Sequence, residues 1–252
     1  LTHFVDEAAD KSFIRVEFED DADGEAELAD LSVAFRETVA RRFGMDFEFH
    51  PSERRMRTMI AVSRQGHCIN ALLHRWRDGH LPIDITGVVS NHDEHRALTE
   101  WYELPFHYLP IEDGRKDEQE ERLLALFEET ESELLVLARY MQILSPTACA
   151  QLAGRAINIH HSFLPGFKGA RPYQQAFDRG VKLIGATAHY VTTNLDEGPI
   201  IEQDVVRVNH EHSVDDLVRK GRDLEKVVFA RAIWNHINHN ILVYQNRTYI
   251  FD

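Results

Sequence analysis

The sequence predicts an α/β protein whose larger part is built on a mainly parallel sheet. From residue 58 onward, strand-like segments alternate with helix-like segments, which is the pattern of βαβ units. Two of these segments, "MIAVS" (59–63) and "ELLVLA" (133–138), are almost entirely apolar. Strands that are buried on both faces of a parallel sheet have this composition. The 43% hydrophobic and 28% charged content is ordinary for a globular protein.

The elements after residue 58 follow one another at short intervals. A helix that stops at Gly79, a helix that begins at Ser145 and Pro146, and a long helix from Ser213 have recognisable capping residues. We expect strands at 59–63, 83–90, 106–110, 133–138, 157–161, 183–191 and 199–208, helices at 68–79, 94–104, 115–130, 173–179 and from 213, and a closing hairpin at 241–251.

The first 50 residues have a separate strand–helix–strand pattern. We expect a strand, a helix capped by Gly44 and a second strand, at 13–19, 26–43 and 46–50. This piece is short for a domain that must be stable by itself. The charged segment "PSERRMR" at 51–57 then interrupts the pattern. We therefore expect two domains, at 1–51 and 58–252.

Charge and cysteine content argue against several classes of protein. The net charge of −14 disfavours nucleic-acid binding, which needs a basic surface. No apolar run approaches the roughly 20 residues that cross a bilayer, and the first residues do not read as a secretory signal. Cys68 and Cys149 lie far apart, so we expect free thiols rather than a zinc site. These features predict a cytoplasmic protein without a membrane partner.

The segment that says most about function is "AINIHHSFLP" at 156–165. Side chains alternate along a strand, so Ile157 and Ile159 share one face while Asn158 and His160 share the other. Ligands of open α/β sheets bind beyond the carboxyl ends of the strands, where this pair would lie. An amide can stabilise an oxyanion and an imidazole can transfer a proton, as acyl transfer requires. Without a Gly-x-Ser-x-Gly nucleophile, water or an external amine would attack.

A carboxylate that could join this pair lies in "TTNLDEGPII" at 192–201, where Asp196 precedes the tight turn at Gly198-Pro199. Two simpler interpretations stay open: a histidine at a strand end is often structural, and an aspartate before Gly-Pro often serves the turn. A metal held by His160 and His161 is not expected, because neighbouring strand residues point to opposite faces.

Four segments resemble the folate-dependent formyl transferase and hydrolase family: "VSRQGHCINALLHRW" (62–76), "LARYMQILS" (137–145), "INIHHSFLPGFKGARPYQQAFDRGVKLIGATAHYV" (157–191) and "LDEGPIIEQ" (195–203). The resemblance implies a Rossmann-like formyltransferase fold that binds no dinucleotide, and a catalytic trio of Asn158, His160 and Asp196. It implies 10-formyltetrahydrofolate as substrate, with no separate cofactor and no metal. The residues implied to contact the folate are Arg139, Met141, Gln142, Ile143, Leu144, Val191 and Thr192.

Some of these implied contacts have simpler interpretations. Met141 and Leu144, which with Ile143 would flank the pteridine ring, could instead serve core packing. Arg139 and Lys168 could bind the glutamate tail of the folate, and each could equally be a surface charge.

The loop "SRQGHCIN" at 63–70 bears on the formyl acceptor. A loop that wraps a nucleotide phosphate is normally rich in glycine, whereas this one has Gly66 alone, among bulky side chains. The His67-Cys68 pair resembles the hydrolases of the family. We therefore expect water as the acceptor and formate as a product, which would supply one-carbon and purine metabolism. An amine-acceptor enzyme such as glycinamide ribonucleotide formyltransferase is the alternative, and a non-catalytic folate sensor is a second one.

The N-terminal piece resembles the later half of an ACT domain, a module that often dimerises and binds small effectors. The opening strand and helix of that module are not found in this sequence, so no effector residues are assigned. The resemblance implies a homo-oligomer, a dimer or tetramer, formed through this domain.

Overall fold

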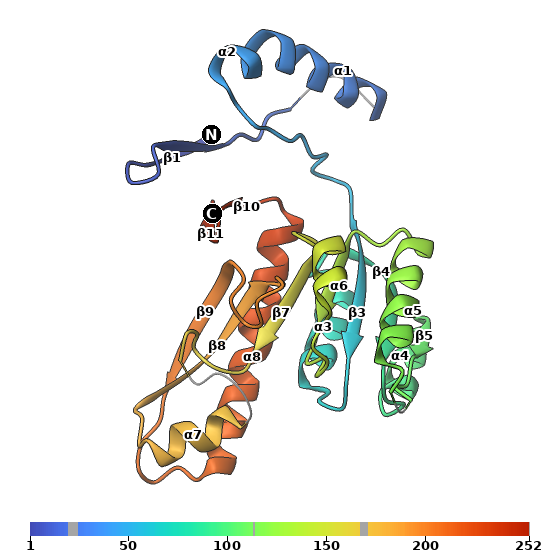
Figure 1. The fold of residues 1–252 in the computed structure, drawn as a ribbon, viewed down its shortest axis with the longest axis vertical. Coiled ribbons are helices and arrows are strands. Elements are labelled where there is room, and N and C mark those ends of the chain that lie inside the picture. Colours follow the sequence, from blue (N-terminus) through green and yellow to red (C-terminus); the bar gives the residue numbers. More distant parts are fainter. Residues whose placement is uncertain (20–24, 113, 167–170, 252) are drawn as a thin grey trace. The chain divides into compact units, whose positions relative to one another are not determined.

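The computed structural model of the chain describes residues 1–19, 25–112, 114–166 and 171–251 (Figure 1). The chain divides into two compact units. The smaller unit comprises Leu1–Arg54 together with Phe251, and the larger comprises Arg55–Ile250. The division lies within the charged segment 51–57.

The smaller unit contains a hairpin and a helix. Strands β1 (Thr2–Asp6) and β2 (Lys11–Arg15) pair antiparallel. Helix α1 (Glu25–Phe35) continues through a π-helical turn, η1 (Arg36–Ala40), into α2 (Arg41–Phe43). The helix ends at Gly44 with φ of 62°, a left-handed conformation that glycine adopts without strain, as predicted for its C-cap.

Two sequence expectations for this unit are wrong. Strand β1 was not predicted, and the strand expected at 13–19 is instead β2, which ends at Arg15. The strand expected at 46–50 is absent from the described residues, and this segment forms no ladder. The alternating Phe47 and Phe49 pack their rings edge-on against Phe35, with centroids 4.8 and 5.5 Å away. Packing against a helix therefore explains the period of two without strand pairing.

The larger unit contains, among the described residues, a seven-stranded sheet in the order β5-β4-β3-β6-β7-β8-β9. The prediction of a mainly parallel sheet is confirmed, because β3 to β7 run parallel. Strands β8 and β9 are antiparallel to their neighbours. The strands are β3 (Met56–Val62), β4 (Ile83–Ser90), β5 (Phe106–Tyr108), β6 (Leu134–Leu137), β7 (Ala156–His160), β8 (Leu183–Tyr190) and β9 (Ile200–Arg207).

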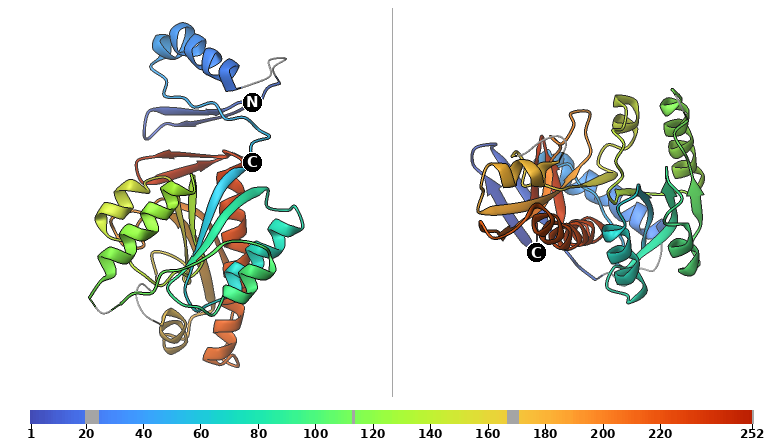
Figure 2. Two further views of the ribbon diagram at one scale, coloured as in Figure 1. Left: turned by 90° about the vertical axis from the view of Figure 1, so that its right-hand side faces the viewer. Right: turned by 90° about the horizontal axis from the view of Figure 1, so that it is seen from below.

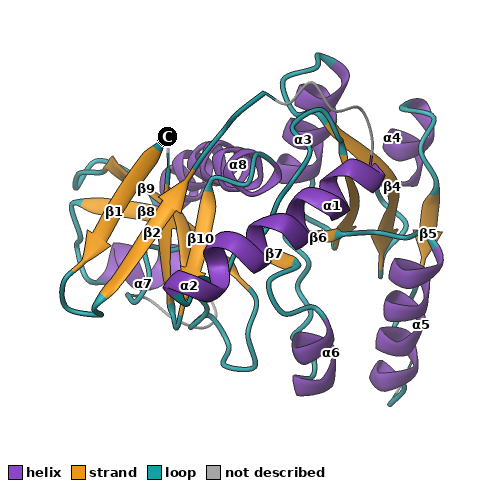
Figure 3. Ribbon diagram, turned by 90° about the horizontal axis from the view of Figure 1, so that it is seen from above, coloured by secondary structure: helices purple, strands orange, loops and turns teal. Residues whose placement is uncertain are grey.

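Helices cover both faces of this sheet (Figures 2 and 3). The core on one face takes side chains from α3, α8 and the segment after α4, and the core on the other takes them from α5 and α6. Both N-cap predictions are confirmed: the Ser145 hydroxyl accepts from the Ala148 N–H, and Ser213 forms a capping box with Asp216. The helices are α3 (His67–Arg77), α4 (Arg96–Trp101), α5 (Lys116–Glu129), α6 (Pro146–Gln151), α7 (Pro172–Asp178) and α8 (Val214–Ile237), and the closing hairpin is β10 (Ile241–Tyr244) with β11 (Arg247–Ile250).

The antiparallel direction of β8 determines where the loop 191–199 can reach. Ile157 of β7 is opposite Tyr190 of β8, so the loop leaves the sheet beside the start of β7. It then folds back, and the Tyr190 N–H donates to the Pro199 carbonyl at 2.9 Å. A Cβ on Gly198 would lie 1.8 Å from the Tyr190 carbonyl oxygen, so this close return requires glycine.

Candidate active site

Strand β7 presents Asn158 and His160 on one face. Ile157 and Ile159, the residues between and before them, are buried in the core on the α3 and α8 face. His160 is only 5% exposed although it lies at the carboxyl end of its strand. The alternation of side chains inferred from the sequence is therefore present.

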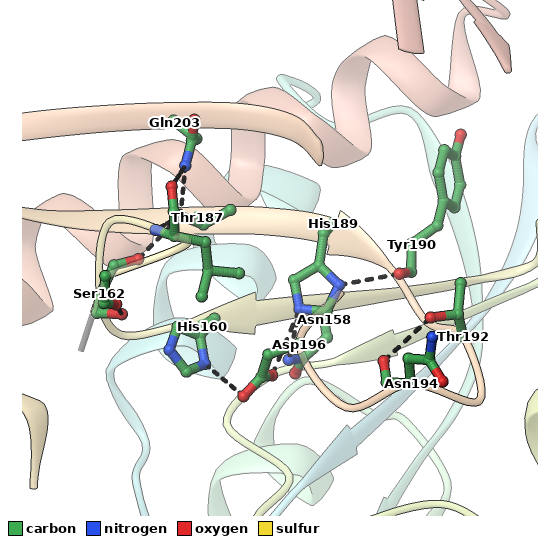
Figure 4. A network of polar contacts seen from close by, with 12 residues as sticks. Asn158, His160, Ser162, Thr187, His189, Tyr190, Thr192, Asn194, Asp196 and Gln203 are labelled. Carbon is green, nitrogen blue, oxygen red and sulfur yellow. Dashed lines mark hydrogen bonds and ion pairs between the residues drawn. The ribbon is translucent and has the colours of Figure 1, made fainter. Parts of the chain in front are cut away.

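The returning loop brings Asp196 to these two residues (Figure 4). Its Oδ2 lies 3.3 Å from Nδ1 of His160, and its Oδ1 lies 3.7 Å from Nε2 of His189. Asp196 has a φ of 56°, a left-handed conformation that few residues other than glycine, asparagine and aspartate adopt. Burial opposes ionisation, but the hydrogen bonds from His160 and His189 outweigh it and hold the pKa of Asp196 below its usual range. This carboxylate is therefore charged near neutral pH.

His189 is a member of this cluster that the sequence analysis did not single out. It is opposite Asn158 in the antiparallel register of β7 and β8, and its Nε2 lies 3.2 Å from Asn158 Nδ2. Its Nδ1 lies 2.9 Å from the Tyr190 carbonyl, which can only accept, so Nδ1 carries the proton. Nε2 faces both the Asn158 amide nitrogen and, at 3.7 Å, the Asp196 carboxylate. The sequence feature that could have indicated His189 is its place near the end of "IGATAHYV", a run made mainly of small or apolar residues.

The second nitrogen of His160 is left without a hydrogen bond. Nε2 is buried and has no partner among the described residues. A buried polar atom left unpaired costs about 1–3 kcal/mol, so such atoms are rare in folded proteins. His160 is thus held by a carboxylate on one nitrogen and open to a ligand on the other.

The segment that follows β7 is held by a side-chain network (Figure 4). Thr187 Oγ1 donates to the Ser162 carbonyl at 2.8 Å and accepts from the Leu164 N–H at 3.0 Å. Gln203 Nε2 donates to the same Thr187 oxygen and to the Leu164 carbonyl, at 2.9 and 3.1 Å. These bonds fix the chain immediately after His160, which limits movement of its ring.

The loop after β6 carries most of the residues expected to contact folate. Met141 and Ile143 are large apolar side chains that are 56% and 59% exposed, whereas Leu144 is buried in the core with α5 and α6. Gln142 is half-buried. The loop is anchored at Ser63, whose hydroxyl accepts from the Met141 N–H at 3.0 Å. Its two exposed apolar side chains suit a flat aromatic ligand, and Leu144 serves packing.

The other expected contacts lie in different surroundings. Val191 and Thr192 are half-buried at the start of the loop that carries Asp196. Arg139 is not a surface charge: its side chain is 11% exposed, and Nε lies 3.6 Å from the carboxylate of Glu225. An arginine committed to a buried carboxylate does not extend into solvent toward a glutamate tail. Lys168 lies outside the described residues.

Glu225 of α8 is the centre of a second buried cluster, which we call the Glu225 cluster: Glu225, His67, Tyr173 and Arg139. Glu225 Oε2 lies 2.7 Å from Nε2 of His67, and Oε1 accepts from the Tyr173 hydroxyl at 2.7 Å. Cys68 Sγ is also near, and one atom each of His67, Cys68 and Glu225 lie within 4.8 Å of one another. Such atoms could bind a metal, but the carboxylate is already occupied and the positive Arg139 disfavours a cation there.

One face of strand β7 carries an amide and an imidazole that a carboxylate holds, and enzymes that transfer or hydrolyse acyl groups use these chemical groups. The sequence pattern of the formyl transferase family matches residues 56–233. The chain therefore belongs to the formyl transferase family.

Relatives in this family carry more particular names. A formyltetrahydrofolate deformylase from Corynebacterium sp. (strain P-1) is 46% identical over 250 residues, covering 99% of this chain and 87% of the relative. A crystal structure of a formyltetrahydrofolate deformylase from Pseudomonas syringae pv. tomato superposes with a TM-score of 0.92 at 43% identity, covering 100% of this chain and 84% of that one. A glycinamide ribonucleotide transformylase from Symbiobacterium toebii matches less well, with a TM-score of 0.76 at 26% identity, covering 83% of this chain and 99% of that one.

Proposed function

We propose that this protein is an enzyme that hydrolyses 10-formyltetrahydrofolate to tetrahydrofolate and formate. The observation that carries the proposal is the His160 ring, which shares one face of β7 with Asn158, is held by Asp196 at Nδ1 and has a buried, unpartnered Nε2. The deformylase relatives at 42–50% identity support it, because they align over most of the chain.

The proposed mechanism uses each member of the trio once. Asp196 accepts the Nδ1–H of His160 and orients the ring together with the attacking water. Water attacks the formyl carbon, and the carbonyl electrons move onto its oxygen. Asn158 and the protonated Nε2 of His160 donate to this oxyanion, the step at which one donor typically lowers the barrier by about 3–4 kcal/mol. The carbon–nitrogen bond then breaks, the folate nitrogen takes a proton, and formate leaves with release of one proton.

The folate itself is the substrate in this proposal, and no further cofactor or metal takes part. Its flat ring would lie on the exposed side chains of Met141 and Ile143, with backbone groups at 191–197 reading its polar edge. Gln142, Val191 and Thr192 are half-buried near these elements, which suits side chains that contact a ligand.

The direct test is formate release by the pure protein in buffer that contains 10-formyltetrahydrofolate and no amine. We expect formate and tetrahydrofolate in equal amounts, and loss of activity in His160→Ala. If both His160→Ala and Asp196→Asn stay within a few-fold of the unchanged protein, the roles assigned to these residues are wrong. An amine-acceptor formyltransferase, the alternative, would release little formate until glycinamide ribonucleotide is added.

We further propose that the protein forms a homo-oligomer through its smaller unit. Val5 and Ile14 of the hairpin and Val16 just after it are each 41–50% exposed, and the register of β1 and β2 puts Val5 and Ile14 on the same face, an apolar surface that a second copy could cover. Light scattering over a range of protein concentrations tests this, and a monomer at every concentration would contradict it.

We also propose a cytoplasmic location, which is supported by two buried free thiols, Cys68 and Cys149. No helix in the described part of the chain is both long and apolar enough to cross a membrane. Cell fractionation with an antibody would test the location directly.

A further inference from the structure

Two polar side chains near the N-terminus of α5 are buried. Helix α5 packs on the sheet through Leu123 and Phe127, which belong to the core on that face. One turn earlier on the same face of the helix are Gln119 and Glu120, which are only 4% and 7% exposed. Glutamine and glutamate are mostly exposed in folded proteins, and burying them is unfavourable unless they are hydrogen-bonded. Their burial is therefore explained by the groups that they bond.

Both side chains bond the loop 138–145, which follows β6. Gln119 Nε2 donates to the Tyr140 hydroxyl at 2.8 Å, and Tyr140 is itself buried. Glu120 Oε2 accepts from the Ser145 N–H, also at 2.8 Å. The buried polar end of α5 is thus matched, group by group, to this loop.

The topology explains why the N-terminus of α5 meets this loop. Helix α5 connects β5 to β6, and both strands belong to the parallel part of the sheet. It therefore begins at the edge where the strands end, beside the loop that leaves β6. Lys116, the first residue of the helix, donates through Nζ to the Ile143 carbonyl. The helix thus bonds the loop at three places.

The ends of two strands hold the same loop. The Ser63 N–H donates to the Arg139 carbonyl at 3.2 Å, and the Ser63 hydroxyl accepts from the Met141 N–H at 3.0 Å. That hydroxyl donates in turn to Asn91 Oδ1 at 2.7 Å. Ser63 and Asn91 directly follow β3 and β4, and both are buried. Within the described chain, residues 138–145 form no helix or strand, so bonds to other elements fix the shape of this loop.

The loop carries the two side chains on which the proposed function places the folate ring. Met141 and Ile143 are 56% and 59% exposed, whereas Tyr140 and Leu144 on either side of them are buried. Ordering a loop at the moment of binding lowers affinity, and a loop that is already held in its bound shape avoids this loss. The bonds from α5 therefore bear on how tightly the ring is bound.

We propose that Gln119 and Glu120 are positioning residues for folate binding: they hold the loop 138–145 so that Met141 and Ile143 present a fixed surface to the pteridine ring. This inference rests on the proposed function and deepens it. It assigns the two residues no contact with the formyl group, so they should affect the affinity for the ring and not the chemical step.

The test separates binding of the ring from the chemical step. The affinity for tetrahydrofolate, the product that keeps the ring, is measured by calorimetry, and KM and kcat are taken from formate release. The variants are Gln119→Leu and Glu120→Ala, with Glu121→Ala as the matched control, because Glu121 is the next residue of the helix and is exposed. Lys116→Met is added because Lys116 is only half-buried, so this variant tests the loop even if the buried changes prevent folding.

We expect the same kinetic pattern in Gln119→Leu, Glu120→Ala and Lys116→Met. Tetrahydrofolate should bind about three- to tenfold more weakly and KM should rise, with kcat changed by less than about twofold. Glu120→Gln keeps an oxygen acceptor without the charge, so its affinity should lie between those of Glu120→Ala and the unchanged protein. Glu121→Ala should leave affinity and KM unchanged. A purely structural role would lower the unfolding temperature and leave the affinity of the folded protein as it was.

The inference is overturned if the variants that fold bind tetrahydrofolate as tightly as the unchanged protein. A fall in kcat at unchanged affinity also overturns it, because the loop would then act on the chemical step. Equal weakening in Glu121→Ala and Glu120→Ala would contradict it as well. If the unchanged protein binds tetrahydrofolate but releases no formate, the proposed hydrolysis has failed, and the affinities still decide the role of the two residues.

Discussion

Asp196 and Glu225 are both buried carboxylates that contact imidazole nitrogens, but they differ in how fully the side chains around them are hydrogen-bonded. Asp196 lies on a turn, its side chain is 11% exposed, and its partner His160 retains a buried nitrogen without a bond. Glu225 lies on a helix, is 1% exposed, and has His67 and Tyr173 bound to its two oxygens. Asp196 orients an imidazole that is still able to react, whereas both oxygens of Glu225 are bonded to other side chains.

The difference shows how a catalytic carboxylate can be told from a structural one when both are buried and ionised. Burial opposes ionisation at both residues, and hydrogen bonds from histidine lower the pKa of each. Direction of the pKa shift therefore does not separate them. What separates them is the kind of group left unpartnered: beside Asp196 it is Nε2 of an imidazole, which can transfer a proton, whereas in the Glu225 cluster it is Nε of the Arg139 guanidinium, which stays charged.

The largest effect that this comparison predicts is on catalysis at Asp196. In Asp196→Asn the His160 ring loses the charge that fixes its tautomer, so kcat for formate release should fall by about 10³–10⁴-fold. Glu197→Gln, the neighbouring carboxylate with an exposed side chain, is the matched control and should stay within a few-fold. A loss below about tenfold in Asp196→Asn would place Asp196 with the structural carboxylates.

A smaller effect is expected at Asn158, which donates to the oxyanion in the proposed mechanism. Asn158→Ala should lower kcat by about 10²–10³-fold, with a much smaller change in KM, because the bond is made mainly in the transition state. Steady-state kinetics of formate release measures both quantities. A rise in KM at unchanged kcat would instead make Asn158 a residue that binds the ground state.

At the Glu225 cluster the comparison predicts a change in stability. Gly221→Ala places a Cβ 2.0 Å from the Tyr173 hydroxyl, so the free energy of unfolding should fall by about 1–3 kcal/mol. In a Tyr173→Ala background the same change should have the opposite sign, because alanine favours a helix over glycine by about 1 kcal/mol. Denaturant unfolding of the unchanged protein, the two single variants and the double variant gives the coupling free energy between positions 221 and 173. If the changes in the free energy of unfolding add, a Cβ at position 221 and the Tyr173 ring do not clash.

The sequence allowed the parallel part of the sheet to be predicted because each strand is an apolar run between helix signals. Asn158 and His160 followed from the alternation of side chains, and Asp196 followed from its turn. His189 could not be found in this way, since it reaches Asn158 through the register of β7 and β8. Whether two strands pair antiparallel is decided by tertiary contacts that no local pattern encodes.

The Glu225 cluster was missed for a related reason. His67 and Glu225 are 158 positions apart, and each has an ordinary place in an amphipathic helix. Arg139 was assigned by resemblance, and the structure gives it a buried partner that the sequence does not indicate. The strand expected at 46–50 is an error of the opposite kind, because a local pattern was present without the structure it predicts. Phe47 and Phe49 alternate with polar residues since both rings pack on Phe35, not because the segment pairs in a sheet.

The smallest predicted effect concerns His161, which lies between the two carboxylates. Burial, and then the nearby positive Arg139, lower its pKa to about 3 from the ordinary 6.5. Between these values the unfolded chain binds a proton at His161 that the folded chain does not, so stability is complete above pH 6.5 and falls as the pH drops. His161 contributes a slope of at most about 1.4 kcal/mol per pH unit. Unfolding measured from pH 7 to 4.5 should therefore show a flatter dependence in His161→Gln, and the same slope in both proteins would mean that His161 is protonated in the folded state.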